Sequence, residues 1–176
     1  MSNGTIFVFI DLEMTGLDVK KHRIIEFAMI LTDTSMNELD RYSTVVHQSD
    51  SVLLNMSEWC VDQFKGPEGL AKNSRDSSTT EKDVITTVIK KLSPYPGTKY
   101  LCGNSVHMDK YFLMEYMPEI TDLLHYRIID ISTLKVLVEE WKPEVEAFKK
   151  QNSHRALDDI IESINELKHF RSKLFL

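Results

Sequence analysis

The run Ile6-Phe7-Val8-Phe9-Ile10-Asp11-Leu12-Glu13-Met14 decides the fold. Its first five residues are all β-branched or aromatic, which is typical of a strand buried at the centre of a sheet. Side chains two apart on a strand point to the same face, so Asp11 and Glu13 converge while Leu12 faces the other way. Such paired carboxylates repel each other and lose solvation, and a divalent cation relieves both costs. An acidic strand end pointing into water is the alternative interpretation.

Two further strands are expected beside this one. Residues 24–32 form a second apolar run, and residues 42–47 form a third with more alternation. Turn signals at residues 16–18 and at Asn37 separate the three runs. Short connections of this kind favour an antiparallel meander.

After the meander, the chain alternates helices with short strands. Residues 56–64 form a short amphipathic segment. Apolar spacing and proline or glycine stops then predict these elements in order: helix 80–92, strand 100–102, helix 108–117, strand 127–130, helix 132–141 and a last helix within 153–174. Residues 72–78 are polar and are expected to form a surface loop. The pattern of three antiparallel strands followed by αβαβα predicts an α/β fold. It would be a mixed five-stranded sheet with helices on its faces, in a single domain over residues 1–176.

Composition limits the classes of partner. No segment approaches the roughly 20 continuous apolar residues of a membrane helix. The formal net charge of −6 argues against a broad basic face that tracks long nucleic acid, and for a small substrate held by few contacts. Cys60 and Cys102 lie far apart and are expected to be reduced core residues. Together with the lack of a recognisable secretory signal, this predicts a cytoplasmic protein, with mitochondrial or nuclear location as alternatives.

A third carboxylate follows a predicted strand end. The strand ending at Cys102 leads through Gly103-Asn104-Ser105 into a helix whose first turn contains Asp109. Loops after strand ends are frequent sites in α/β sheets. Asp109 is therefore either a ligand or a residue that complements the helix dipole.

A fourth carboxylate lies on the last helix. With Ile160 at the centre of the apolar stripe, Asp159 falls at the border of the buried face, whereas Asp158 falls on the solvated side. Asp159 is thus the better ligand candidate.

Histidine placement leaves two possibilities open. His154 precedes the last helix and could lean over the same site as Asp159. His125 and Asp130 have the same spacing around a predicted strand, and periodicity does not separate the two pairs.

Eight short phrases, in order along nearly the whole chain, carry a family resemblance. They are DLEMTGL (11–17), RIIE (23–26), GNS (103–105), YMPE (116–119), HYR (125–127), DISTL (130–134), WKPE (141–144) and HRALDD (154–159). Jointly they resemble the DEDDh family of 3′→5′ exonucleases and, within it, the oligoribonucleases. The sequence motifs at 105–107 and 153–156 are more similar to those of the eukaryotic branch than to those of the bacterial one.

The resemblance implies an RNase H-like fold and a two-metal phosphodiesterase. Its catalytic centre would consist of Asp11, Glu13, Asp109, Asp159 and His154. The four carboxylates would hold two divalent cations, Mg²⁺ or Mn²⁺, and His154 rather than His125 would be the general base.

Substrate contacts follow from the same resemblance. Leu17 and Trp59 would sandwich the terminal bases, while Ser105, Arg127 and Ser132 would hold the 5′ phosphate of a very short RNA. Members of the family are homodimers, and Tyr126 would reach into the partner's site. One departure concerns a histidine that usually follows the tryptophan, where Phe64 or Lys65 stands here.

The expected function is therefore 3′→5′ hydrolysis of RNA of two to a few nucleotides into 5′-mononucleotides. One alternative is a general DEDDh exonuclease acting on DNA or RNA. Others are a nucleic-acid-binding module that does not cut and an α/β domain with a structural metal.

Overall fold

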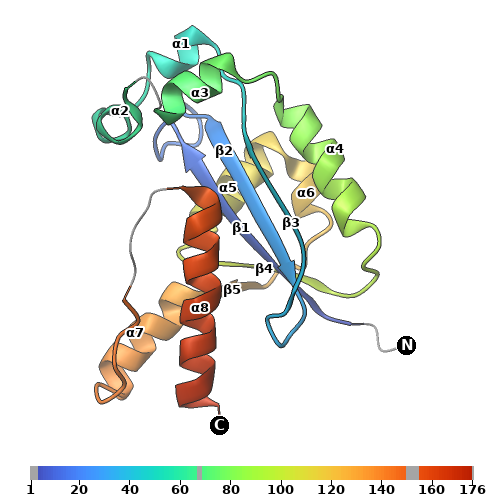
Figure 1. Cartoon of the computed structure of the whole chain (residues 1–176), viewed down its shortest axis with the longest axis vertical. Coiled ribbons are helices and arrows are strands. Elements are labelled where there is room, and N and C mark those ends of the chain that lie inside the picture. Colours follow the sequence, from blue (N-terminus) through green and yellow to red (C-terminus); the bar gives the residue numbers. More distant parts are fainter. Residues whose placement is uncertain (1–3, 67–68, 150–154, 176) are drawn as a thin grey trace.

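Five strands form one mixed sheet in the spatial order β3-β2-β1-β4-β5 (Figure 1). The structure, a computed structural model, describes residues 4–66, 69–149 and 155–175. The strands are β1 (Ile6–Met14), β2 (Ile24–Thr32), β3 (Glu38–Val45), β4 (Lys99–Gly103) and β5 (Ile128–Asp130). β1 pairs antiparallel with β2 and parallel with β4, and β3 and β5 extend the sheet in the same senses. This arrangement confirms the predicted mixed sheet with β1 at its centre.

The helices follow the predicted order with three additions. They are α1 (Asp50–Leu53), α2 (Glu58–Phe64), α3 (Leu70–Asp76), α4 (Glu81–Leu92), α5 (His107–Tyr116), α6 (Pro118–Thr121), α7 (Ile131–Trp141) and α8 (Ala156–Leu174). The two short helices α1 and α6 and the helix α3 were not expected. None of the described helices is long and apolar enough to cross a membrane.

Two predictions about local structure are wrong, one about a loop and one about the start of a strand. Residues 72–78 do not form a loop, because α3 occupies most of them and buries Leu70 and Ser74. A two-turn helix with so few apolar residues leaves no periodic signal. The third strand begins at Glu38 rather than at residue 42, since pairing with β2 satisfies the backbone of polar residues that look unlike a strand.

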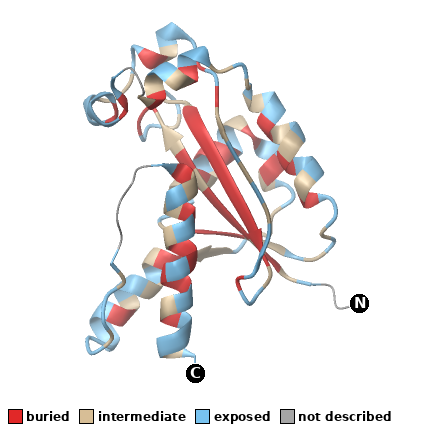
Figure 2. Cartoon of the chain, viewed as in Figure 1, coloured by how far each residue is buried: buried red, intermediate tan, exposed pale blue. Residues whose placement is uncertain are grey.

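The two faces of β1 belong to different layers. The side chains of Val8, Ile10 and Leu12 join the core cluster that packs against α4, α5 and α6. Phe9 joins the opposite cluster, which packs against α7 and α8. Every residue of β2 is buried between these layers, as Figure 2 shows. Alternation along β1 therefore turns Asp11 and Glu13, which share the side of Phe9, toward α8.

A smaller apolar cluster lies under α1, α2 and α3. It consists of Ile25, Leu53, Cys60, Phe64 and Leu70. Cys60 and Cys102 are both free and buried, as expected. α2 is fastened to the end of β1, because Ser57 N–H donates to Thr15 O at 2.9 Å and Cys60 Sγ donates to Met14 O at 3.4 Å.

Candidate active site

Three carboxylates meet where β1 passes α8. Asp11, Glu13 and Asp159 each offer one ligand oxygen, and these oxygens lie within 4.8 Å of one another. We call these three residues the acidic cluster. Asp158 is exposed while Asp159 is half-buried, so the helix brings to the strand the residue that its apolar stripe predicted. Leu12 points into the opposite core cluster, also as predicted.

Asp109 lies beside this cluster and is buried. Its Oδ1 accepts a hydrogen bond from Leu12 N–H at 2.9 Å, so it is tied to the backbone between Asp11 and Glu13. The negative charge of Asp109 contributes to raising the pKa of Asp11. Asp109 is therefore close enough to interact electrostatically with the carboxylates of the cluster.

The electrostatics of the four carboxylates are unfavourable without a cation. Burial raises the pKa of Asp11 well above its usual range, and the neighbouring carboxylates Asp109, Glu13 and Asp159 raise it further. Burial, followed by the charges of Asp159 and Glu26, raises the pKa of Glu13 to about 8. Burial also raises the pKa of Asp109 to about 7. Three of the four acidic groups are thus held in a setting that penalises their charge, and the charge of Asp159 adds to that penalty at Asp11 and Glu13.

This donor set fits a hard divalent cation. Carboxylate oxygens are the ligands that Mg²⁺ and Mn²⁺ prefer, and a bound cation reverses the penalty that raises these pKa values. The convergence of three oxygens from a strand and a helix, rather than from one flexible loop, also holds the ligands in place before any metal binds.

An ion pair between buried Glu26 and the partly exposed Arg155, which the sequence did not reveal, lies next to the acidic cluster. Glu26 lies opposite Glu13 in the pairing of β1 with β2. Its carboxylate accepts hydrogen bonds from Arg155 Nε at 3.0 Å, from an Arg155 terminal nitrogen at 2.7 Å and from Ala156 N–H at 3.1 Å. The partners are 129 and 130 positions apart in the chain, so no local pattern could have indicated the contact.

An apolar cavity of about 310 Å³ adjoins the acidic cluster. It is lined by Leu12, Glu13, Met14, Gly16, Leu17, Ser57, Trp59 and Cys60. Leu17 is 70% exposed and Trp59 is 56% exposed, which is unusual for residues of this size. The structure therefore brings the two predicted base-stacking residues to one cavity that Glu13 also lines.

Phe64 and Lys65, which stand near the position of the family's usual histidine, differ in their surroundings. Phe64 is buried, and its ring meets that of Trp59 edge-on with centroids 6.3 Å apart. Lys65 is exposed, and its Nζ donates to Asp62 at 2.8 Å. Phe64 supports Trp59 from the interior, so of the two only Lys65 presents its side chain outward.

Two predicted phosphate-binding residues come together at the ends of β4 and β5. The hydroxyls of Ser105 and Ser132 lie 3.3 Å apart, and Ser105 N–H donates to the Ser132 hydroxyl at 3.0 Å. Asp130 Oδ1 accepts hydrogen bonds from the backbone N–H groups of Ser105 and Ser132, each at 3.0 Å. Asn104 Oδ1 accepts from the Ser132 hydroxyl at 3.1 Å. Since β1, β4 and β5 are parallel, these serines lie at the same edge of the sheet as the acidic cluster.

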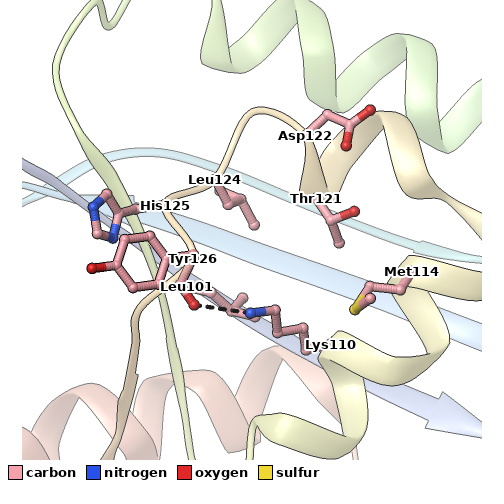
Figure 3. A pocket seen from close by; sticks show the side chains of 8 residues that line it. All are labelled: Leu101, Lys110, Met114, Thr121, Asp122, Leu124, His125 and Tyr126. Atoms are coloured by element: carbon pink, nitrogen blue, oxygen red, sulfur yellow. Dashed lines mark hydrogen bonds between the residues drawn. The ribbon is translucent and has the colours of Figure 1, made fainter.

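Arg127 and Tyr126 lie on the approach to β5. Tyr126 is 71% exposed, and the Arg127 guanidinium carbon lies 5.1 Å from its ring centroid. Tyr126 also borders a second cavity of about 360 Å³ (Figure 3). In it Lys110 Nζ donates to Tyr126 O at 3.0 Å.

The two histidine–aspartate pairs have different surroundings. His125 packs against the rings of Tyr100 and Tyr126, with centroids 4.8 and 4.4 Å away. Asp130 caps the N-terminus of α7. Both are thus engaged in local structure, and neither is one of the three carboxylates of the acidic cluster. His154, the predicted general base, lies outside the described residues.

Comparison with known proteins gives consistent matches over almost the whole chain. The exonuclease family RNase_T matches residues 8–167. The oligoribonuclease of Marinobacter nauticus is 45% identical over 99% of both chains. That of Haemophilus influenzae is 48% identical over 93% of this chain and 92% of its own. The probable oligoribonuclease of Schizosaccharomyces pombe is 44% identical over 94% of this chain and 67% of its own.

Solved structures with the same fold are more distant in sequence. Exonuclease I of E. coli in a complex with single-stranded DNA superposes with a TM-score of 0.77 at 15% identity. Exonuclease I of Methylocaldum szegediense gives 0.74 at 18% identity. Each match covers 97% of this chain but only 41% of the exonuclease I chain. The shared feature is the RNase H-like arrangement of sheet and helices.

Proposed function

This chain belongs to the RNase_T family of exonucleases, and within it to the oligoribonucleases, and from that premise we propose that it releases 5′-mononucleotides from the 3′ end of very short RNA. The observation that carries the proposal is the position of Glu13, which belongs both to the acidic cluster and to the lining of the apolar cavity. A terminal nucleotide stacked in that cavity would have its phosphodiester beside the carboxylates.

The metal centre we propose holds two divalent cations, Mg²⁺ or Mn²⁺. Asp11 would contact both, Glu13 and Asp159 would complete the site of the first, and Asp109 would support the second directly or through water. Cations bound there supply a Lewis acid for water activation and offset the charge that develops on the phosphate. The carboxylates contribute fixed, partly buried oxygens that need no rearrangement during the reaction.

His154 is the proposed general base. In the sequence it directly precedes Arg155, the N-cap of α8, and stands five residues before Asp159. An imidazole has an ordinary pKa near 6.5, which suits a group that removes a proton from water close to neutral pH.

Substrate length would be measured between the cavity and the serine pair, Ser105 and Ser132. Leu17 and Trp59 offer apolar surface that accepts any base, because every base has a π-face. Ser105, Ser132 and Arg127 would bind the 5′ phosphate of a strand short enough to reach from one site to the other. This division gives selection by length without selection by sequence.

The active form we propose is a homodimer, and we also propose that the chain is of the eukaryotic type. Exposed Tyr126 and Trp141, together with the cavity beside Tyr126, offer an apolar surface for a second copy, and Tyr126 would enter the partner's site. The sequence motifs at 105–107 and 153–156 support the eukaryotic branch.

We propose the cytoplasm as the compartment of this protein, with mitochondria or the nucleus as alternatives, because both thiols are free and buried. We further propose that residues 1–176 form one domain.

The decisive experiment is hydrolysis of 5′-labelled RNAs of two, three, five and ten nucleotides, with the matching DNAs alongside. Each would be incubated with Mg²⁺, with Mn²⁺ and with EDTA, and an Asp11→Ala variant would control for contaminating nuclease. We expect metal-dependent release of mononucleotides, fastest on the shortest RNA. Light scattering of the same sample would report whether it is a dimer.

Other outcomes separate the alternatives. Equal cleavage of long DNA would assign a general DEDDh exonuclease instead. Retained oligonucleotide binding without cleavage under either metal would assign a binding module.

A further inference from the structure

An ion pair between Glu26 and Arg155 connects β2 to the start of α8. We propose that Glu26 and Arg155 are positioning residues that set the distance between the strand ligands and Asp159, and so determine the affinity of the acidic cluster for its cation. We call the Glu26 carboxylate, the Arg155 guanidinium and Ala156 N–H the clamp. The inference rests on the proposed metal-dependent function and adds to it two residues that do not touch substrate.

The clamp holds the end of the helix that carries a ligand. Arg155 is the N-cap of α8 but makes no side-chain cap hydrogen bond within the helix. The N–H groups of a first helical turn lack intrahelical partners, and that end of the helix carries partial positive charge. The Glu26 carboxylate, from another element, accepts from Ala156 N–H at 3.1 Å and supplies the missing acceptor and the favourable charge.

The ligand Asp159 lies one helical turn after Arg155 of the clamp. Asp159 N–H donates to Arg155 O at 3.0 Å, which is the first i to i+4 hydrogen bond of this end. The position of Arg155 therefore determines the position of Asp159. On the other side, Glu26 is the direct cross-strand partner of Glu13. A single carboxylate thus connects the strand that holds Asp11 and Glu13 to the helix that holds Asp159.

Glu26 is unsuited to be a ligand itself although it is acidic and adjacent. It is 4% exposed, and its two oxygens are both occupied, Oε1 by the guanidinium and Oε2 by Ala156 N–H and Arg155 Nε. The charge of Glu26 helps raise the pKa of Glu13, while that of Arg155 lowers it. The pair therefore adds little net charge near the cluster, and geometry is its main contribution.

Two substitutions distinguish positioning from charge because charge alone predicts opposite results. Glu26→Gln removes a negative charge near the cluster and Arg155→Gln removes a positive one. If only charge mattered, the first would weaken Mn²⁺ binding and the second would strengthen it. If the clamp positions Asp159, both weaken it. Loss of an outer partner of a metal ligand commonly lowers affinity by about 10- to 100-fold.

The experiment measures Mn²⁺ affinity of the full chain by calorimetry and by electron paramagnetic resonance, without substrate. Asp40→Asn is the matched control, because Asp40 makes a partly buried ion pair with Lys91 at 2.8 Å. Asp40 pairs with Leu31, five residues beyond Glu26 on β2, which is about 16 Å along the strand. We expect a tenfold or greater loss of affinity for both clamp variants and no change for the control.

Arg155→Lys covers the case in which Glu26→Gln does not fold. It keeps the charge and the Glu26–Ala156 hydrogen bond, and we expect an affinity between those of the wild type and Arg155→Gln. Unchanged or tighter Mn²⁺ binding by Arg155→Gln would overturn the inference. A wild-type protein that binds no Mn²⁺ would instead overturn the proposed function, so the two failures are distinguishable.

Discussion

Replacing Glu13 with glutamine should make the metal-free protein more stable while removing its activity. The pKa of Glu13 is raised from 4.5 to about 8 by burial and by the charges of Asp159 and Glu26. The folded protein therefore holds a proton that the unfolded chain releases, so stability falls as the pH rises from 4.5 through 8. Two and a half pH units lie between 4.5 and pH 7, and each is worth about 1.4 kcal/mol, so the penalty at pH 7 is about 3 kcal/mol.

Urea denaturation in EDTA measures this penalty. Glu13→Gln should exceed the wild type by up to about 3 kcal/mol in free energy of unfolding at pH 7, and by less than about 1 kcal/mol at pH 5. Adding Mg²⁺ should stabilise the wild type and not the variant. Exposed Glu140 provides a control, since Glu140→Gln should change stability by less than about 0.5 kcal/mol at either pH. Equal stability of Glu13→Gln and wild type at pH 7 would refute the reasoning.

Further predictions concern ligands and contacts one by one. Asp159→Ala should abolish metal-dependent turnover of diribonucleotides, and near wild-type kcat would contradict its place in the acidic cluster. His154→Ala should lower kcat by about 10²- to 10⁴-fold with RNA binding largely unchanged; an unaltered rate would remove it as the base. Arg127→Ala should weaken binding of 5′-phosphorylated dinucleotides by about 10- to 100-fold in equilibrium titrations, and an equal loss for 5′-hydroxyl dinucleotides would argue against phosphate recognition. Trp59→Ala should raise KM by about 5- to 150-fold for all four terminal bases, as expected for one lost stacking contact; a base-specific effect would contradict that.

Sequence reasoning was most accurate where the apolar periodicity of a strand or helix determines the side to which each side chain points. Alternation on β1 correctly separated Asp11 and Glu13 from Leu12, and helical geometry correctly preferred Asp159 to Asp158. In both cases a buried apolar pattern fixes the orientation of the element, and the polar residues follow from it. The strand β2 was predicted to the residue for the same reason.

What sequence reasoning missed depends on contacts between distant segments. Glu26 stands in an otherwise apolar strand and its partner Arg155 lies 129 positions away, so neither residue indicates the other. A buried glutamate in a central strand is nonetheless a signal, because such a charge requires a partner. The helix α3 was missed because it buries only Leu70 and Ser74, too few apolar positions to form a stripe, and the Ser74 hydroxyl donates to Val46 O at 2.6 Å.

Alternate side chains of β1 pack into two different core layers. The number of residues in this strand is therefore more tightly constrained than the identity of each apolar residue. One residue inserted between Ile6 and Asp11 would exchange the two sides of everything that follows. The carboxylates would then turn into the apolar layer under α4, α5 and α6, and Leu12 would face α8. A single insertion would thus cost the protein its core and its chemistry together, whereas exchanging one apolar residue for another would touch only packing. We therefore expect this strand to tolerate substitution during divergence far better than any change in the number of its residues.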